Sequence, residues 1–281
     1  MADIPAPSRM RVWQRPAWLK LPVLVGIAII AFWIVTCLTI DLWPTYDPIE
    51  LGRRLQPPGL DHWFGTDALG RDVLSRTLHG ARLSLAMCVG VIFVAVLVGS
   101  TIGAIAGYVG GIVDGFLMRL VDVTLSFPPI LLAMAVTAAL GTGLENAAIA
   151  MTIVWWPVYA RLMRGQVLSV KSREHVEAAT AAGASHNRTL LKHILPLTWS
   201  PILINATMDF GQVVLLIASL SFIGLGASPP APEWGSMIFE GKRNFYQWWI
   251  CSGPGIAILS VVLAFNFLGD GLRDLLDPRS K

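Results

Sequence analysis

The stretch EAATAAGASHNRTLLKHILP, Glu177 to Pro196, is a polar interval between two long apolar runs. Ser172 and Ser185 can each cap the start of a helix. Gly183 can end the first of these helices, and Pro196 is expected to stop the second. The interval is therefore predicted to form a helical hairpin. Because it is rich in alanine, another surface can approach it closely, which suits docking to a soluble partner better than catalysis.

Composition identifies the class of protein. Of the 281 residues, 54% are hydrophobic and 14% are charged, whereas typical soluble domains carry about 25% charged residues. The net charge of +3 is small and scattered, so nucleic acid is not an expected partner. The three cysteines and five histidines show no spacing typical of metal ligands. The chain is therefore predicted to lie in a lipid bilayer, with no metal and no cofactor of its own.

Long runs with few charges predict the membrane spans, because about 20 apolar residues cross a bilayer. Six runs qualify, at residues 21–40, 83–108, 116–139, 146–164, 201–225 and 249–268. The first run is too long for a signal peptide and no small-residue cleavage site follows it, so it is read as an uncleaved span. The predicted fold is an all-α polytopic membrane protein with six transmembrane helices.

Basic residues predict the orientation, because Lys and Arg accumulate in cytoplasmic segments. Of the 21 Lys and Arg residues, 14 fall on the side that holds both chain ends and the hairpin. The predicted cytoplasmic parts are the N-terminal segment 1–20, the hairpin 171–196 and the tail 269–281. Loops 41–82 and 226–248 are predicted to be extracytoplasmic, and residues 83–268 form a five-helix core.

Particular residues within the spans predict how the helices pack. Gly99 and Gly103 form a G-x-x-x-G pattern that lets two helices approach closely, so the second span is expected inside a bundle. The prolines after Phe127 should break or kink the third span. Arg119 and Asp122 lie three residues apart and are expected to form an ion pair.

Asp209 lies about eight residues into the fifth predicted span, roughly 12 Å along a helix. A carboxylate at that depth is costly unless it is paired, protonated or wetted, which makes it a functional candidate. Asn205 and Gln212 lie one turn away on the same face, and the three could line an aqueous path. The alternative is that Arg161 or Arg164 holds Asp209 for structural reasons.

The first outer loop ends in charged residues whose role the pattern leaves open. The loop, residues 41–82, is expected to be irregular and to end in a short helix. Asp67, Arg71 and Asp72 are read as solvated residues making local hydrogen bonds, or as functional ones. The sequence contains no phosphate-binding G-x-x-x-x-G-K-[ST] loop, no H-E-x-x-H and no G-x-S-x-G, so the chain is not expected to be an enzyme or to hydrolyse ATP.

The hairpin resembles the EAA motif of ATP-binding-cassette importer permeases, in which E-A-A, a glycine and a final L-P recur at fixed spacing. Here Glu177-Ala178-Ala179, Gly183 and Leu195-Pro196 match, while His193 stands where the motif has isoleucine. Further similarity covers most of the chain after the first span. It lies in GTD and GRD at 65–72, LSFIGLG at 220–226, PEWGS at 232–236 and GDGLRD at 269–274. These features resemble the second permease subunit of dipeptide, oligopeptide and nickel importers.

The resemblance implies a type I importer permease fold in a bacterial inner membrane. The implied partners are a second permease subunit in a heterodimer, two ATPase subunits that bind ATP and Mg, and an extracytoplasmic solute-binding protein. The hairpin would then be a coupling helix seated in an ATPase. Its contact residues would be Glu177, Ala178, Ala179, Gly183, Ala184, Leu195 and Pro196. Many relatives carry an acidic residue where this chain has Ile217, so the polar residue of the fifth span is here a different one.

Several functions remain open at this stage. Dipeptides or oligopeptides are the first choice of substrate, with nickel chelates, glutathione-like peptides and opine-type compounds as alternatives. An ion-coupled secondary transporter using Asp209 is the second hypothesis, although inverted repeats and paired broken helices are not evident. An intramembrane enzyme ranks far below both, because its catalytic residues are missing.

Overall fold

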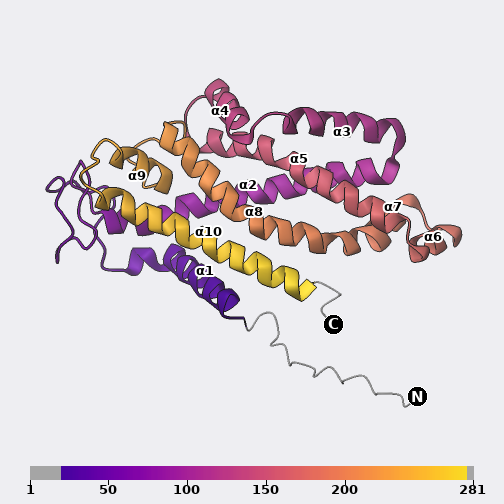
Figure 1. Cartoon of the computed structure of the whole chain (residues 1–281), viewed down its shortest axis with the longest axis horizontal. Coiled ribbons are helices and arrows are strands. Elements are labelled where there is room, and N and C mark those ends of the chain that lie inside the picture. Colours follow the sequence, from indigo (N-terminus) through magenta and orange to yellow (C-terminus); the bar gives the residue numbers. More distant parts are fainter. Residues whose placement is uncertain (1–19, 277–281) are drawn as a thin grey trace, which may run out of the picture.

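The computed structural model describes residues 20–276, and within this range the chain is helical apart from loops and one isolated β-bridge between Thr66 and Asp72. The all-α prediction is confirmed (Figure 1). The elements are α1 Leu21–Thr39, η2 Ile40–Leu42, α2 Val73–Val109, α3 Gly111–Leu125, α4 Pro129–Leu140, α5 Leu144–Lys171, α6 Glu174–Ala181, α7 His186–Arg188, η3 Thr189–Ile194, α8 Leu195–Ile223, α9 Trp234–Gly241 and α10 Trp249–Leu276. The predicted segment before Lys20 and the tail after Leu276 lie outside the described residues.

Helices α2 and α5 form the centre of the bundle, and glycine makes their close contact possible. A Cβ atom placed on Gly99 would collide with the backbone carbonyl of Trp156, and one on Gly103 with that of Ala160. The hydrophobic effect does not drive helices together in lipid, so their association depends on van der Waals contacts between closely packed backbones. The prediction that this span lies inside a bundle is confirmed.

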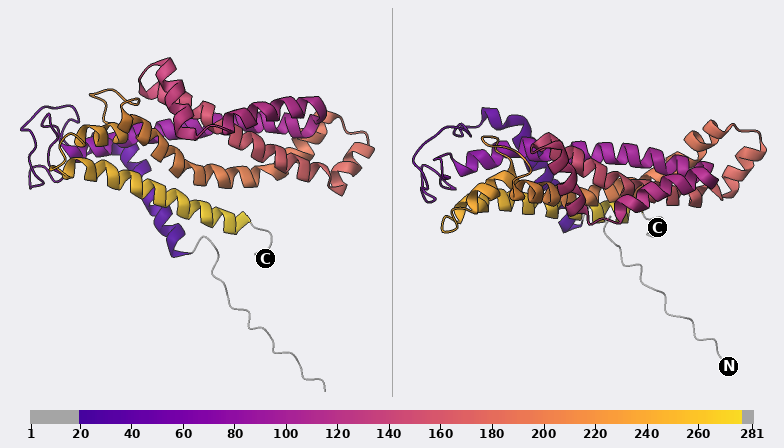
Figure 2. Two further views of the ribbon diagram at one scale, coloured as in Figure 1. Left: turned by 45° about the horizontal axis from the view of Figure 1, so that its top comes forward. Right: turned by 90° about the horizontal axis from the view of Figure 1, so that it is seen from above.

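The remaining helices cover the α2–α5 pair. In Figures 1 and 2, α8 and α10 run beside α2, and α1 lies against α10. Helices α3 and α4 both pack against α5. The loops at 43–72 and 224–248 gather at one end of the molecule, here called the loop end, and the hairpin projects from the opposite end (Figure 1). Lys20 at the start of α1 pairs with Asp274 near the end of α10 at 2.5 Å, so the two ends of the described chain meet.

The third predicted span is broken where the prolines stand. Helices α3 and α4 meet at 91° across residues 126–128, because Pro128 and Pro129 cannot donate the hydrogen bonds that would continue the helix. The predicted pairing of Asp122 with Arg119 is wrong. Asp122 instead accepts a hydrogen bond from Arg161 of α5 at 2.6 Å, since the Asp122 side chain is directed at the neighbouring helix.

By length and hydropathy, four of the described helices can cross a membrane, or five if α3 and α4 together count as one span. The fourth predicted span, residues 146–164, lies in α5, which has 28 residues but does not pass on hydropathy. Helix α5 contacts α2, α3, α4 and α8. Because other helices shield much of its surface from lipid, α5 can carry more polar side chains than a lipid-exposed helix of the same length.

Helix α2 begins ten residues before the predicted span, at Val73. The carboxylate of Asp72 accepts a hydrogen bond from the backbone N–H of Ser75 at 2.7 Å and thereby caps the helix. The predicted short helix at the end of the loop is therefore the first part of α2 itself. The helix carries Arg76 and Arg82 near its start, so its charge-free run begins only at residue 83.

Helix α9 lies against the first turns of α2 at the loop end. Glu233 caps α9 through the backbone N–H groups of Gly235 and Ser236, at 2.9 and 2.7 Å. Burial raises the pKa of Glu233, and these two hydrogen bonds act in the opposite direction. Trp234 is fully buried and donates to the carbonyl of Thr77 at 2.9 Å. The cap stabilises the start of α9, and the buried indole of Trp234 attaches α9 to α2.

Candidate functional site

The hairpin, residues 171–196, begins with α6 and turns at Gly183. The N–H of Gly183 bonds to the carbonyl of Thr180 at 3.0 Å, and the N–H of Ala184 bonds to that of Ala179 at 3.1 Å. This pair of bonds is the Schellman motif, which requires a left-handed residue at the position of Gly183. Gly183 has φ +83°, and the space around it is open. The prediction that Gly183 ends the first helix is correct. The helix ends there because glycine adopts the left-handed conformation that the Schellman motif requires.

The capping predictions for the two arms are wrong in part. The residue before α6 is Arg173, and Ser172 donates instead to the carbonyl of Ser169 at 3.4 Å. Ser185 does precede the second arm, but its side chain makes no capping bond. Both arms therefore start without a side-chain cap.

Pro196 does not stop the second arm. Helix α7 continues through the π-helical segment η3 directly into α8, and Pro196 lies in the first turn of α8. A proline there costs little, because the N–H groups of a first turn have no partner within the helix. Single π-helical turns are rare and occur frequently at functional positions. The hairpin is consequently continuous with a membrane-spanning helix.

The residues predicted to contact a partner are accessible. Glu177, Ala178, Gly183 and Pro196 are exposed, and Ala179, Ala184 and Leu195 are half-buried. The hairpin is held to the bundle by other side chains, the buried Val176, Thr189 and Ile194. Five of the seven predicted residues lie in α6 and the turn, where another protein could contact them, and Leu195 and Pro196 lie at the start of α8.

A cavity of about 910 Å³ separates the hairpin from the ends of α2 and α5. Lys171 crosses it and donates to the backbone carbonyl of Tyr108 at 2.6 Å. The hydroxyl of Tyr108 lies 3.1 Å from Nδ1 of His186 in the second arm. The first contact joins the ends of α5 and α2, and the second joins α2 to the second arm of the hairpin.

Asp209 is the centre of a second polar group, in the middle of the bundle. Its Oδ2 accepts hydrogen bonds from Trp155 Nε1 at 3.2 Å and from Tyr159 Oη at 2.9 Å. Both donors belong to α5, so the carboxylate joins α5 to α8. The alternative holding groups, Arg161 and Arg164, are engaged elsewhere and do not contact it.

The structure does not link Asp209 to its two predicted companions by hydrogen bonds. Asn205 donates to the carbonyl of Pro201 in its own helix at 2.9 Å. Gln212 is exposed, and within residues 20–276 its side chain has no hydrogen-bond partner. The three residues share one face of α8, as their spacing requires.

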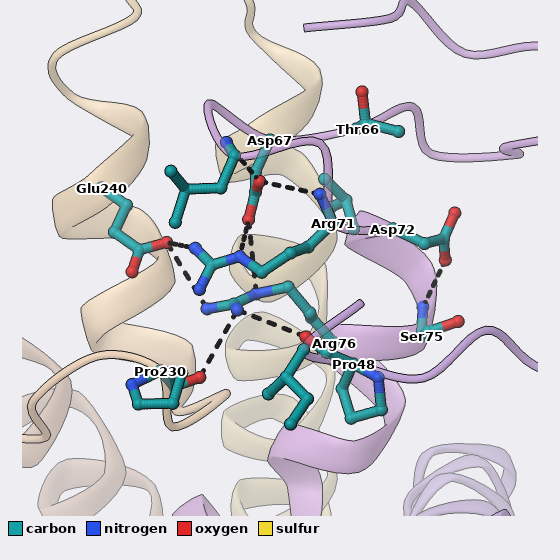
Figure 3. A network of polar contacts seen from close by, with 12 residues as sticks. Pro48, Thr66, Asp67, Arg71, Asp72, Ser75, Arg76, Pro230 and Glu240 are labelled. Carbon is teal, nitrogen blue, oxygen red and sulfur yellow. Dashed lines mark hydrogen bonds and ion pairs between the residues drawn. The ribbon is translucent and has the colours of Figure 1, made fainter. Parts of the chain in front are cut away.

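A third polar group lies at the loop end and is buried. Arg71 donates from Nε to Asp67 at 2.7 Å and from Nη2 to Glu240 of α9 at 2.6 Å (Figure 3). Arg76 reaches the same Glu240 oxygen at 3.4 Å and the backbone carbonyls of Pro48 and Pro230. Two guanidinium groups thus balance two carboxylates. The network joins the first loop, α2 and α9.

The expectation of solvated loop charges is wrong, because Asp67, Arg71 and Asp72 are only 2%, 2% and 5% exposed. Arg76 and Glu240 were not identified from the sequence. Arg76 lies in the first turn of α2 and Glu240 in the short helix α9, neither with a distinctive spacing, and Glu240 lies 169 residues from Arg71 in the chain. Only the fold brings them together.

No group of three or more His, Cys, Asp or Glu residues in the described part of the chain is placed to hold a metal ion. The arrangement consists of a projecting helical hairpin, a carboxylate at mid-bundle and a buried ionic network at the loop end.

Comparison with known proteins gives a consistent result. Residues 99–281 match the family described as "Binding-protein-dependent transport system inner membrane component". The chain is 44% identical to a probable D,D-dipeptide transport system permease protein of Escherichia coli, covering 92% of this chain and 88% of that protein. It is also 44% identical to a dipeptide transport system permease protein of Alkalihalophilus pseudofirmus, covering 92% and 86%. A glutathione transport system permease protein of Escherichia coli is 45% identical, covering 92% and 84%.

A solved structure resembles the fold. A chain of the inward-facing MetNI methionine ABC transporter matches with a TM-score of 0.59 and 22% identity, covering 72% of this chain and 97% of that one. At this identity the likeness concerns the fold alone.

Proposed function

Because the chain belongs to the family of binding-protein-dependent transport system inner membrane components, we propose that it is the permease subunit through which an ATP-driven importer moves dipeptides or oligopeptides. The proposal of a peptide substrate rests on the relatives, two of which are named as dipeptide permeases. Glutathione, itself a small peptide, is the best supported alternative substrate, since a third relative is named for it. Nickel chelates and opine-type compounds rank lower.

The observation that carries the coupling role is the exposed hairpin. The space around Gly183 at its turn is open, its arms are short, and its second arm runs without interruption into α8. We place an ATPase subunit on the face that includes Glu177, Ala178 and Gly183. Binding of ATP and Mg would then move the ATPase pair, and the ATPase pair would move α8. A helix with two positions is an element whose equilibrium a ligand can shift by binding one position more tightly.

The remaining parts of the assembly follow from this placement. The hairpin end faces the cytoplasm together with both chain termini, and the loop end faces the extracytoplasmic solute-binding protein. A second permease subunit completes the translocation path in a heterodimer within the bacterial inner membrane. Asn205, Asp209 and Gln212 line that path on α8. ATP hydrolysis takes place on the partner ATPase subunits.

Substitution at Gly183 tests the coupling role, with importer complexes reconstituted in proteoliposomes. Gly183→Val should abolish ATP-driven peptide uptake, because valine does not adopt the left-handed conformation that the turn needs. Gly183→Asn is the matched control, since asparagine is of similar size and tolerates that conformation. Both variants should reach the membrane in normal amounts. Normal uptake by the valine variant would refute the assignment of this hairpin.

An ion-coupled secondary transporter is the competing function. It would use Asp209 as its ion site and would need no ATPase. Peptide uptake by this chain alone, driven by an ion gradient in vesicles without ATP, would support it over the importer.

A further inference from the structure

Asp209 stands midway along α8, about 21 Å from each end of the helix. A carboxylate at this depth is rare, and where it occurs it faces the interior of an assembly or a water-filled cavity. The side chain is half-buried within this chain, so one part of it remains accessible. Lipid is an unfavourable neighbour for that part. The accessible side of Asp209 therefore faces the path or the second subunit.

The two carboxylate oxygens are used differently. Both hydrogen bonds, from Trp155 and Tyr159, end on Oδ2. No group among residues 20–276 donates to Oδ1, and Oδ1 is not among the buried atoms that lack a partner. One oxygen is thus held by α5 while the other is open and its direction is set.

No cation of the described chain neutralises this carboxylate. Arg161 pairs with Asp122, and Arg164 makes two hydrogen bonds to Asp114 at 2.5 and 2.6 Å. Asp209 belongs to no group of three or more His, Cys, Asp or Glu residues within residues 20–276 that could hold a metal ion. The positive charge that Asp209 attracts is therefore sought outside the described part of the chain.

We propose that Oδ1 of Asp209 binds the primary ammonium group of a peptide during its passage. A carboxylate supplies a charge-assisted hydrogen bond to such a group. This inference rests on the proposed function and adds a chemical requirement to it. Dipeptides, oligopeptides and glutathione all carry such an ammonium group.

The test uses the complete importer in proteoliposomes, with its binding protein and ATPase subunits, and measures dipeptide uptake per ATP hydrolysed. Asp209→Asn should lower this ratio about ten- to hundredfold, the range for a lost hydrogen bond to a charged group. The asparagine keeps an oxygen for the two α5 donors, so the helix contact survives. ATPase activity stimulated by the binding protein should persist in this variant.

Two control variants separate binding from structure. Tyr159→Phe weakens the α5–α8 contact but leaves the carboxylate, and Thr207→Val removes a hydroxyl that bonds only to its own helix. Both should stay within about threefold of the wild type, well below one lost charged interaction. An equal loss in Tyr159→Phe and Asp209→Asn would overturn the proposal in favour of a purely structural contact.

The remaining outcomes are also decisive. Unchanged uptake by Asp209→Asn would refute the ammonium site while leaving the peptide importer intact. Wild-type uptake without ATP that a protonophore abolishes would make Asp209 a proton site instead. A wild-type complex that hydrolyses ATP but imports neither a dipeptide nor glutathione would overturn the proposed substrate class, and the ammonium site with it.

Discussion

Replacing Glu240 by Gln should destabilise the loop end, because Glu240 is one of two carboxylates in a buried network with two guanidinium groups. Its side chain is 19% exposed, and those of Arg71 and Arg76 are 3% and 1% exposed. The glutamine keeps an oxygen of similar position but no charge. Two buried cations would then share the single carboxylate of Asp67.

The size of this effect follows from the cost of leaving a buried charge without its partner. Removing one member of a buried ion pair lowers the free energy of unfolding by about 3–5 kcal/mol. Because glutamine retains an oxygen, we expect a loss of about 3 kcal/mol for Glu240→Gln. At roughly 2–4 °C per kcal/mol, the apparent melting temperature should fall by roughly 6–12 °C. Tryptophan fluorescence of the purified protein in detergent measures it, since Trp234 lies in the same short helix.

A second variant tests the reasoning. Arg71→Gln combined with Glu240→Gln restores the balance, with Asp67 facing Arg76 at 3.6 Å. The double variant should be more stable than the sum of the two single effects predicts, by about 0.5–3 kcal/mol. A Glu240→Gln protein that melts within about 1 °C of the wild type, or strictly additive single effects, would show that the network does not stabilise the loop end.

Two further expectations concern helix packing. Gly103→Leu should prevent folding of the bundle, because a Cβ there collides with the α5 backbone, whereas Gly90→Leu on the same helix meets no atom within 4 Å and should fold normally; fluorescence-detected size-exclusion chromatography compares them. Asp122→Asn should change the stability by no more than about 1 kcal/mol in the same melting assay, because the side chains of Asp122 and Arg161 are 61% and 56% exposed; a larger loss would show that this surface pair is stronger than its exposure indicates.

Local rules predicted much of the fold. The glycine that ends α6 and the prolines that break the third span act through their own backbone chemistry, which the sequence states directly. The spacing of small residues predicted that the second span lies inside a bundle, but not that α5 is its neighbour. Such features depend on neighbours in the chain, so they can be inferred without coordinates.

The errors share a different cause, which is that the deciding partner is distant in the sequence. Asp122 finds Arg161 on another helix, and Arg71 finds Glu240 from a later segment. The polar character of α5 reflects its position between other helices. Pro196 was predicted to end the second arm, whereas it lies in the first turn of α8. A proline that ends one helix and a proline that begins the next look alike in sequence. The carboxylate at Asp209 was identified, while its two α5 donors were not.

The uninterrupted course from α7 through η3 into α8 gives the molecule a lever. His186–Ile223 is a single run of 38 helical residues, roughly 55 Å long, with Asp209 beyond its midpoint. A push on the hairpin is carried along this rod without a loop to absorb it. The π-helical turn and Pro201 are irregular points of this rod, so in the proposed importer their stiffness sets how much of each movement of the hairpin reaches the level of Asp209.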